Sequence, residues 1–121
     1  MMKGENMARK SALETGILND SAFYILSTLI EEKHGYLIMK IIEESTNNSV
    51  VIGPASLYTT LKKLLDSGLI ERKKTNDEAT KIYQITTKGK DILESDINRK
   101  KSMIEFAESL LQKRTGDNNE N

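Results

Sequence analysis

The hydrophobic pattern of the chain changes its period at Gly68, and this change constrains the fold more than any other feature. Before Gly68, residues 55–67 carry an apolar stripe at helical spacing, formed by Leu57, Leu61, Leu64 and Leu65. After it, residues 69–74 and 81–86 are two short runs typical of strands, joined by the polar segment 75–80. The sequence therefore predicts a helix that Gly68 stops, followed directly by a β-hairpin.

A first helix is expected near the start of the chain, where apolar residues recur at spacings of three and four from Ile17 onward. Its beginning is open to two interpretations. Asp20 and Ser21 either cap this helix or lie inside a longer one that begins near Ser11. Gly35 supplies the permissive backbone that is expected to end it.

A second helix follows at once, with its apolar residues turned inward: Leu37, Ile38, Ile41 and Ile42. Residues 47–48 break this helix, and residues 50–52 form a short apolar run that we interpret as a stub of strand. Pro54 suits the first turn of the third helix. Thr86 or Thr87 is expected to cap a long last helix.

This order of elements predicts a mostly α (α+β) fold, a winged helix-turn-helix with a two-stranded wing and a long C-terminal dimerisation helix. The chain is long enough for one small core. Its expected divisions are a flexible N-terminal arm over 1–12, a winged-helix domain over 13–90, the C-terminal helix over 91–114 and a disordered tail over 115–121.

Composition argues against several classes of protein. The chain has no cysteine, which removes disulfides, thiolate zinc sites and a cysteine nucleophile, and the single His34 is too little for a histidine metal site. No phosphate loop or hydrolase triad is present, so we predict no enzyme, no metal and no cofactor. Without a signal-like N-terminus or a run of ~18 apolar residues, no membrane segment and a cytoplasmic location are expected.

Charge is segregated along the chain although the formal net charge is zero. Residues 54–90 hold eight Lys or Arg against four acids, whereas residues 1–53 and 91–121 each hold five against seven. A basic middle between acidic flanks offers a polyanion one place to bind. Charge alone does not separate this interpretation from that of a solvated hairpin with ordinary lysines.

The outward face of the third helix favours DNA as the polyanion. The short side chains of Ser56 and Thr59 allow close approach to the major groove, and Lys63 reaches phosphates or guanine edges. Lys62 lies at the edge of this face and Tyr58 at its margin. We therefore predict a recognition helix over 54–67 and a wing over 71–83, whose cations lie along the DNA backbone: Lys73, Lys74 and Lys81.

Three segments together resemble the PadR family of regulators, in the family's order and across residues 17–95. They are His34-Gly35-Tyr36, then Ser56-Leu57-Tyr58-xx-Leu61-xx-Leu64-xxx-Gly68-Leu69-Ile70, then Lys81-Ile82-Tyr83-x-Ile85-Thr86-xx-Gly89-xxx-Leu93. The resemblance implies a dimeric, repressor-type protein that binds double-stranded DNA. It also implies that the third helix enters the major groove and that the C-terminal helix joins the subunits.

The last helix carries an apolar stripe that predicts a homodimer. Its members are Leu93, Ile97, Ile104, Ala107 and Leu111, widened by Met103, Phe106 and Leu110 and interrupted by Lys100 and Lys101. A helix this far from the winged core is not expected to bury such a stripe in its own domain, and two-fold pairing covers it economically. The alternative is that the helix folds back on the first helix of its own chain.

Two further hypotheses concern ligands and partners. A small-molecule effector, if there is one, is expected between the first and last helices of partner subunits, near Phe23, Ser27, Met103 and Phe106. The alternative function is a winged-helix protein-interaction module that no longer binds DNA, an interpretation supported by the zero net charge and by two acids at the wing tip, Asp77 and Glu78.

Overall fold

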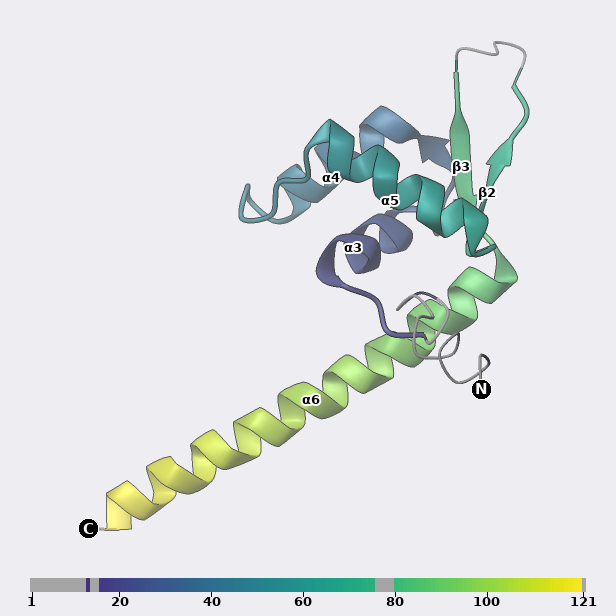
Figure 1. Ribbon diagram of the computed structural model, residues 1–121. Helices are drawn as coiled ribbons and strands as arrows, with labels where there is room; N and C mark the ends of the chain where they lie inside the picture. Colours follow the sequence, from purple (N-terminus) through teal and green to yellow (C-terminus); the bar gives the residue numbers. More distant parts are fainter. Residues whose placement is uncertain (1–12, 14–15, 76–79, 121) are drawn as a thin grey trace, which may run out of the picture.

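The computed structural model describes Leu13, residues 16–75 and residues 80–120. Figure 1 shows a body of helices with a small sheet, from which one long helix extends. The elements are α3 (Asp20–Thr28), β1 (Lys33–His34), α4 (Gly35–Ser45), α5 (Pro54–Asp66), β2 (Ile70–Lys73), β3 (Ile82–Ile85) and α6 (Thr87–Glu120). The predicted winged helix-turn-helix is confirmed. The expected arm over 1–12 and the wing tip at 76–79 lie outside the described residues.

Helix α3 begins at a cap that the sequence analysis did not identify. The side-chain oxygen of Asn19 accepts a hydrogen bond from the backbone N–H of Ala22 at 2.8 Å, so Asn19 is the N-cap. Asp20 is therefore the first residue of the helix and not its cap. A longer helix from Ser11 is also wrong, because residues 17–19 are not helical.

The segment after α3 forms a strand that the local pattern did not reveal. Helix α3 ends at Thr28, and the ammonium of Lys33 donates hydrogen bonds to the carbonyl oxygens of Thr28 and, at 2.8 Å, Glu31. Residues 33–34 then pair antiparallel with β3, which makes a three-stranded sheet in the order β1-β3-β2. Gly35 does not end the first helix as predicted; it begins α4, since pairing with a distant strand decides the backbone here.

The structure of the turn between α4 and α5 agrees in part with the prediction from the sequence. Asn47 and Asn48 have positive φ angles of 52° and 65°, which confirms the predicted break. Residues 50–52 form no strand, contrary to prediction, because Ile52 is buried in the core and the segment has no ladder partner. Pro54 lies in the first turn of α5, as predicted.

One core joins the helices to the sheet. Helix α3 contacts α4, α5 and α6, so it lies at the centre of the body. The largest fully buried apolar side chains come from every part of the fold up to the hairpin: Ile25, Leu26, Leu29, Ile38, Leu57, Leu61, Leu64 and Leu69. None of the helices among the described residues is long and apolar enough to cross a membrane.

Thr86 and Gly89 fix the start of α6 against the end of α5. Thr86 caps the helix, since its hydroxyl accepts a hydrogen bond from the Gly89 backbone N–H at 3.0 Å and donates one to the Gly68 carbonyl at 2.7 Å. Gly68 has a φ of +75°, which confirms it as the stop of α5. A Cβ on Gly89 would lie 2.1 Å from the carbonyl oxygen of Leu69, so only glycine permits this contact.

A buried carboxylate holds the first half of α6 against α3. The side chain of Asp96 is fully buried and accepts hydrogen bonds from Arg99 Nε at 2.7 Å and from Lys100 Nζ. Lys100 Nζ also donates to the Leu18 carbonyl at 3.1 Å and lies 4.6 Å from the centre of the Phe23 ring. Burial acts to raise the pKa of Asp96, but its hydrogen bonds and charge interactions with the two cations lower it overall.

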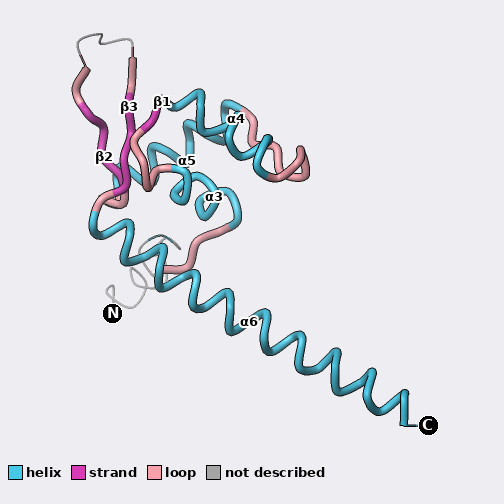
Figure 2. The backbone as a smooth tube through the Cα atoms, turned by 180° about the vertical axis from the view of Figure 1, so that it is seen from behind, coloured by secondary structure: helices cyan, strands magenta, loops and turns pink. Residues whose placement is uncertain are grey.

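Beyond Lys100, α6 leaves the body, and the two opposite views in Figures 1 and 2 agree on this. All side chains from residue 101 to residue 114 are exposed. The helical backbone continues to Glu120, past residue 114 where the sequence predicts its end. The chain has its one proline at position 54, so no proline stops the helix in this region.

Replacing Gly89 with alanine should destabilise the protein by more than about 2 kcal/mol, because the new Cβ overlaps the Leu69 carbonyl. The measurement is urea unfolding at one fixed protomer concentration. Gly53→Ala is the matched control, since nothing lies within 4 Å of its Cβ position, and its effect should stay below about 1 kcal/mol. Equal unfolding midpoints for the two variants would contradict the close approach.

Replacing Asp96 with asparagine should lower the free energy of unfolding at pH 7 by about 2 kcal/mol, since charged hydrogen bonds are lost. Folding lowers the pKa of Asp96, so its ionised form stabilises the protein above pH ~4, and this contribution disappears as the pH falls through the lowered pKa. The gap between wild type and variant should therefore close in acid, in urea titrations at several pH values. Asp91→Asn, at an exposed position of α6, is the control.

Candidate nucleic-acid interface

Helix α5 has one buried side and one open side. Leu57, Leu61 and Leu64 pack into the core, where the helix contacts α3. The helix ends in two hydrogen bonds of the Schellman type, from the Gly68 N–H to the Leu65 carbonyl and from the Leu69 N–H to the Leu64 carbonyl, both at 3.0 Å. These constraints fix the rotation of α5, so its other side faces solvent.

The open side carries all five residues that the sequence analysis assigned to the recognition helix: Ser56, Tyr58, Thr59, Lys62 and Lys63 are exposed. Lys62 is not a free cation, since its ammonium lies 3.0 Å from Asp66 Oδ2. Lys63 borders a hollow of about 420 Å³ between α5 and the start of α3, together with Asn19 and Thr60. The helix therefore presents hydroxyl groups and lysines, with Asp66 at its last turn.

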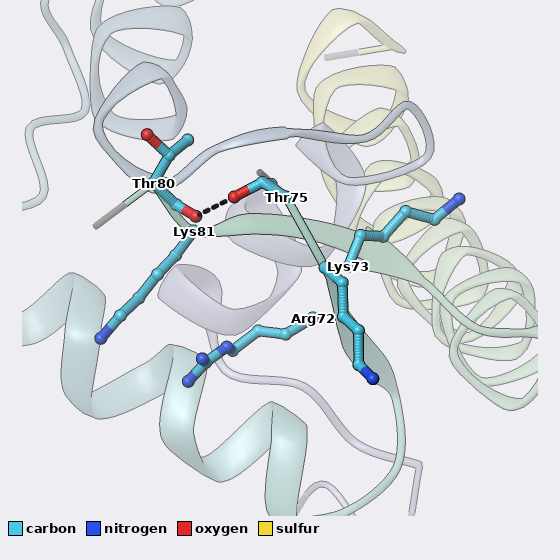
Figure 3. A pocket seen from close by; sticks show the side chains of 6 residues that line it. Arg72, Lys73, Thr75, Thr80 and Lys81 are labelled. Carbon is cyan, nitrogen blue, oxygen red and sulfur yellow. Dashed lines mark hydrogen bonds between the residues drawn. The ribbon is translucent and has the colours of Figure 1, made fainter. Parts of the chain in front are cut away.

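The wing carries a basic hollow of about 520 Å³, lined by Arg72, Lys73, Lys74, Thr75, Thr80 and Lys81 (Figure 3). All four cations are exposed. The hydroxyl of Thr75 donates to the Thr80 carbonyl at 3.0 Å and so closes the described end of the hairpin. Three of the cations were predicted DNA contacts; Arg72 was counted among the basic residues but not assigned to the site.

The strand register separates two of these cations. Arg72 lies opposite Tyr83 and Lys73 lies opposite Ile82, so their side chains leave opposite faces of the sheet. The ammonium of Lys73 lies 3.1 Å from Oε1 of Glu32, which follows α3. Lys73 is therefore tied to the body of the protein, whereas Arg72 shares the face of the buried Tyr83.

The wing meets α4 and α5 at a cluster of aromatic rings. A Cβ on Gly35 would lie 3.3 Å from the Tyr58 hydroxyl oxygen and 3.4 Å from the Tyr83 ring, so Gly35 lets both tyrosines approach the start of α4. Burial raises the pKa of Tyr83, the Arg72 cation opposes this, and Tyr58 adds to it. His34 packs its ring 5.7 Å from the Tyr36 ring. A hollow of about 180 Å³ here is lined by Lys81 and Tyr58 among others.

The structure divides the residues that were predicted for dimerisation. Leu93 is 4% exposed and belongs to the core of its own chain, so its side chain is not available to a partner, contrary to prediction. Ile97 is half-buried against the same core. Ile104, Ala107 and Leu111 are exposed on the free half of α6. The difference arises because the first turns of α6 fold back on α3, the arrangement that was weighed as the alternative.

The four residues predicted near an effector site are not brought together around any of the three hollows described above. Phe23 packs against the core beneath Lys100, and the Ser27 hydroxyl donates to the Phe23 carbonyl at 2.7 Å within α3. Met103 and Phe106 are 54% and 67% exposed on the free half of α6. The three hollows described above are lined by other residues.

The chain is similar to known regulators. The sequence profile of the transcriptional regulator PadR-like family matches residues 25–95. A transcriptional regulator from Clostridium thermocellum is similar at 27% sequence identity and a TM-score of 0.61, over 85% of this chain and 97% of that chain. Bacillus subtilis PadR in complex with operator DNA is similar at 28% identity and a TM-score of 0.57, over 64% of this chain and 46% of that one.

A PadR family transcriptional regulator from Eggerthella lenta shares the fold, with 21% identity and a TM-score of 0.69 over 92% of this chain and 97% of that chain. No curated protein is significantly similar to the chain.

Proposed function

Because the chain belongs to the transcriptional regulator PadR-like family, we propose that it is a sequence-specific DNA-binding regulator that acts as a homodimer. In this proposal α5 lies in the major groove and reads base edges, and the β2–β3 wing contacts the sugar-phosphate backbone. The membership points away from an enzyme.

The observation that carries this proposal is the open side of α5. Its exposed residues Ser56 and Thr59 are short, so a helix can approach the groove floor closely, and the nearby Lys63 adds a cation. The wing follows α5 directly in the chain. Its basic hollow supplies positive charge for the DNA phosphates. Bacillus subtilis PadR, a similar structure, is in complex with operator DNA, which supports DNA as the partner of this chain.

The free half of α6 supports the homodimer. Its exposed apolar residues fall within an arc of about 160° at 100° per residue: Met103, Ile104, Phe106, Ala107, Leu110 and Leu111. Contiguous exposed apolar side chains mark interaction surfaces, and a second copy of the same helix presents the same stripe. Two α5 helices in such a dimer face half-sites about 34 Å apart.

The finer points of regulation are repression and effector binding. The DNA bound by the similar Bacillus subtilis PadR is an operator. A dimer bound at an operator excludes other proteins from the same DNA. We therefore propose that this chain represses transcription. An effector site near Phe23, Ser27, Met103 and Phe106 needs the α6 of a second copy to enclose it, since Met103 and Phe106 are open in one chain.

DNA binding is tested with duplexes selected from a random pool, measured by fluorescence anisotropy at several salt concentrations. If each subunit neutralises ~3 phosphates, the log–log salt slope of a dimer is about −5. Thr59→Val and Lys63→Ala should each reduce the preference for selected over random duplex by about tenfold. Lys101→Ala, an exposed cation on α6, should leave that preference unchanged. If no duplex binds at low salt, the result favours the alternative function, a winged-helix protein-interaction module that no longer binds DNA.

The dimer is tested with Leu110→Glu, which places a charge inside the stripe of both copies. The dimer dissociation constant should rise at least about 100-fold, because each buried leucine contributes about 1.5–3 kcal/mol. Sedimentation equilibrium then reports a mass near the 13.6 kDa of one chain, where the wild type gives about twice that value. Gln112→Glu, on the opposite side of the helix, should remain dimeric. Identical behaviour of the two variants would refute this interface.

A further inference from the structure

The cations of the wing differ in whether an acidic side chain pairs with them. Within the residues that the structure describes, Lys73 has an acidic partner, whereas Arg72, Lys74 and Lys81 make no ion pair. The side chain of Lys73 is 43% exposed and that of its partner Glu32 is 49% exposed, so the pair is open to water yet in contact at 3.1 Å. Among the described residues, the positive charge of the wing is therefore uncompensated on Arg72, Lys74 and Lys81.

Arg72 shares its face of the sheet with the aromatic cluster that joins the wing to α5. Its cross-strand partner Tyr83 lies on the core face of the sheet, in the aromatic cluster that also contains Tyr58 of α5. Lys81 borders both this cluster and the basic hollow, which makes the two hollows neighbours. In Figure 3 the side chains of Arg72 and Lys81 extend to the same side of the hairpin.

We infer that Arg72, together with Lys81, is the phosphate-binding side of the wing, and that Lys73 is not part of it. The inference rests on the proposed DNA-binding function and deepens it. One strand of the duplex passes between the start of α5 and the wing, where Tyr58 and Lys81 border one hollow. The guanidinium of Arg72 offers a planar fork that matches two phosphate oxygens, whereas a lysine offers a single point charge.

Lys73 instead makes a contact within the protein. Its ion pair with Glu32 links the wing to the segment that joins α3 and β1, on the far face of the sheet from Arg72. An exposed pair of this kind adds at most about 1 kcal/mol, so it orients the hairpin more than it stabilises the fold. The sequence pattern predicts Lys73 as a DNA contact, because a run of basic residues does not reveal which face each one occupies.

The test measures binding of a labelled duplex of arbitrary sequence over a range of salt concentrations. Arg72→Gln and Lys81→Gln should each make the log–log salt slope of a dimer shallower by about 2, since each removes one phosphate contact per subunit. Their affinity at low salt should fall about tenfold. Arg72→Lys should keep the slope, because the charge remains, and lose part of the affinity, because the fork is gone.

Lys73→Gln is the matched control, since it removes the same charge one position along the same strand. It should leave the slope unchanged, and circular dichroism on each variant verifies that it is folded. A slope that falls as much for Lys73→Gln as for Arg72→Gln overturns the inference. If wild type binds and none of the variants alters the slope, the inference fails while the proposed function stands; if wild type binds no duplex at low salt, the proposed function itself fails.

Discussion

The contact between Gly89 and the backbone of Leu69 couples helix α5 to helix α6. Leu69 follows the turn that ends α5, so its carbonyl moves with α5, and the start of α6 packs directly on it. A second attachment lies two helical turns further along, where Asp96 and Lys100 hold α6 to the segment before α3. A helix attached at one point can swing, but one attached at two points cannot. The direction of the free half of α6 is therefore set by the same body that orients α5.

The zero net charge of the chain is a poor guide to what it attracts, because the structure pairs its charges selectively. Two of the ion pairs join parts of the fold: Asp96 binds Lys100, which contacts the segment before α3, and Glu32 binds Lys73 of the wing. Arg72 and Lys81 keep their charge uncompensated among the described residues. Screening limits the reach of exposed charges to about 10 Å at 0.1 M salt. A polyanion at the wing therefore responds to these cations and hardly to acids that lie farther than this from the wing.

Sequence patterns predicted the elements that local chemistry determines and missed those that depend on distant contacts. The start of α5 at Pro54, its stop at Gly68 and both strands of the hairpin follow from residues within one turn or one strand. Strand β1 was missed, because residues 33–34 become a strand only by pairing with β3. Arg72 and Lys73 are adjacent and chemically alike in the sequence, and only the register assigns them to opposite faces. Which face of the sheet each cation occupies is thus set by the tertiary structure.

The apolar stripe of α6 shows how one helix face can serve two partners in succession. At 100° per residue, Leu93, Lys100, Ile104 and Leu111 share one face, yet Leu93 is in the core and the last two are exposed. Lys100 interrupts the stripe at the border, where its ammonium binds Asp96 and the Leu18 carbonyl. A purely apolar stripe can slide along its partner by whole heptads, whereas a buried charge pair cannot be displaced without leaving a charge uncompensated. Lys100 therefore fixes where the intramolecular contact ends, and in the proposed dimer the apolar surface left for the second copy begins at Met103.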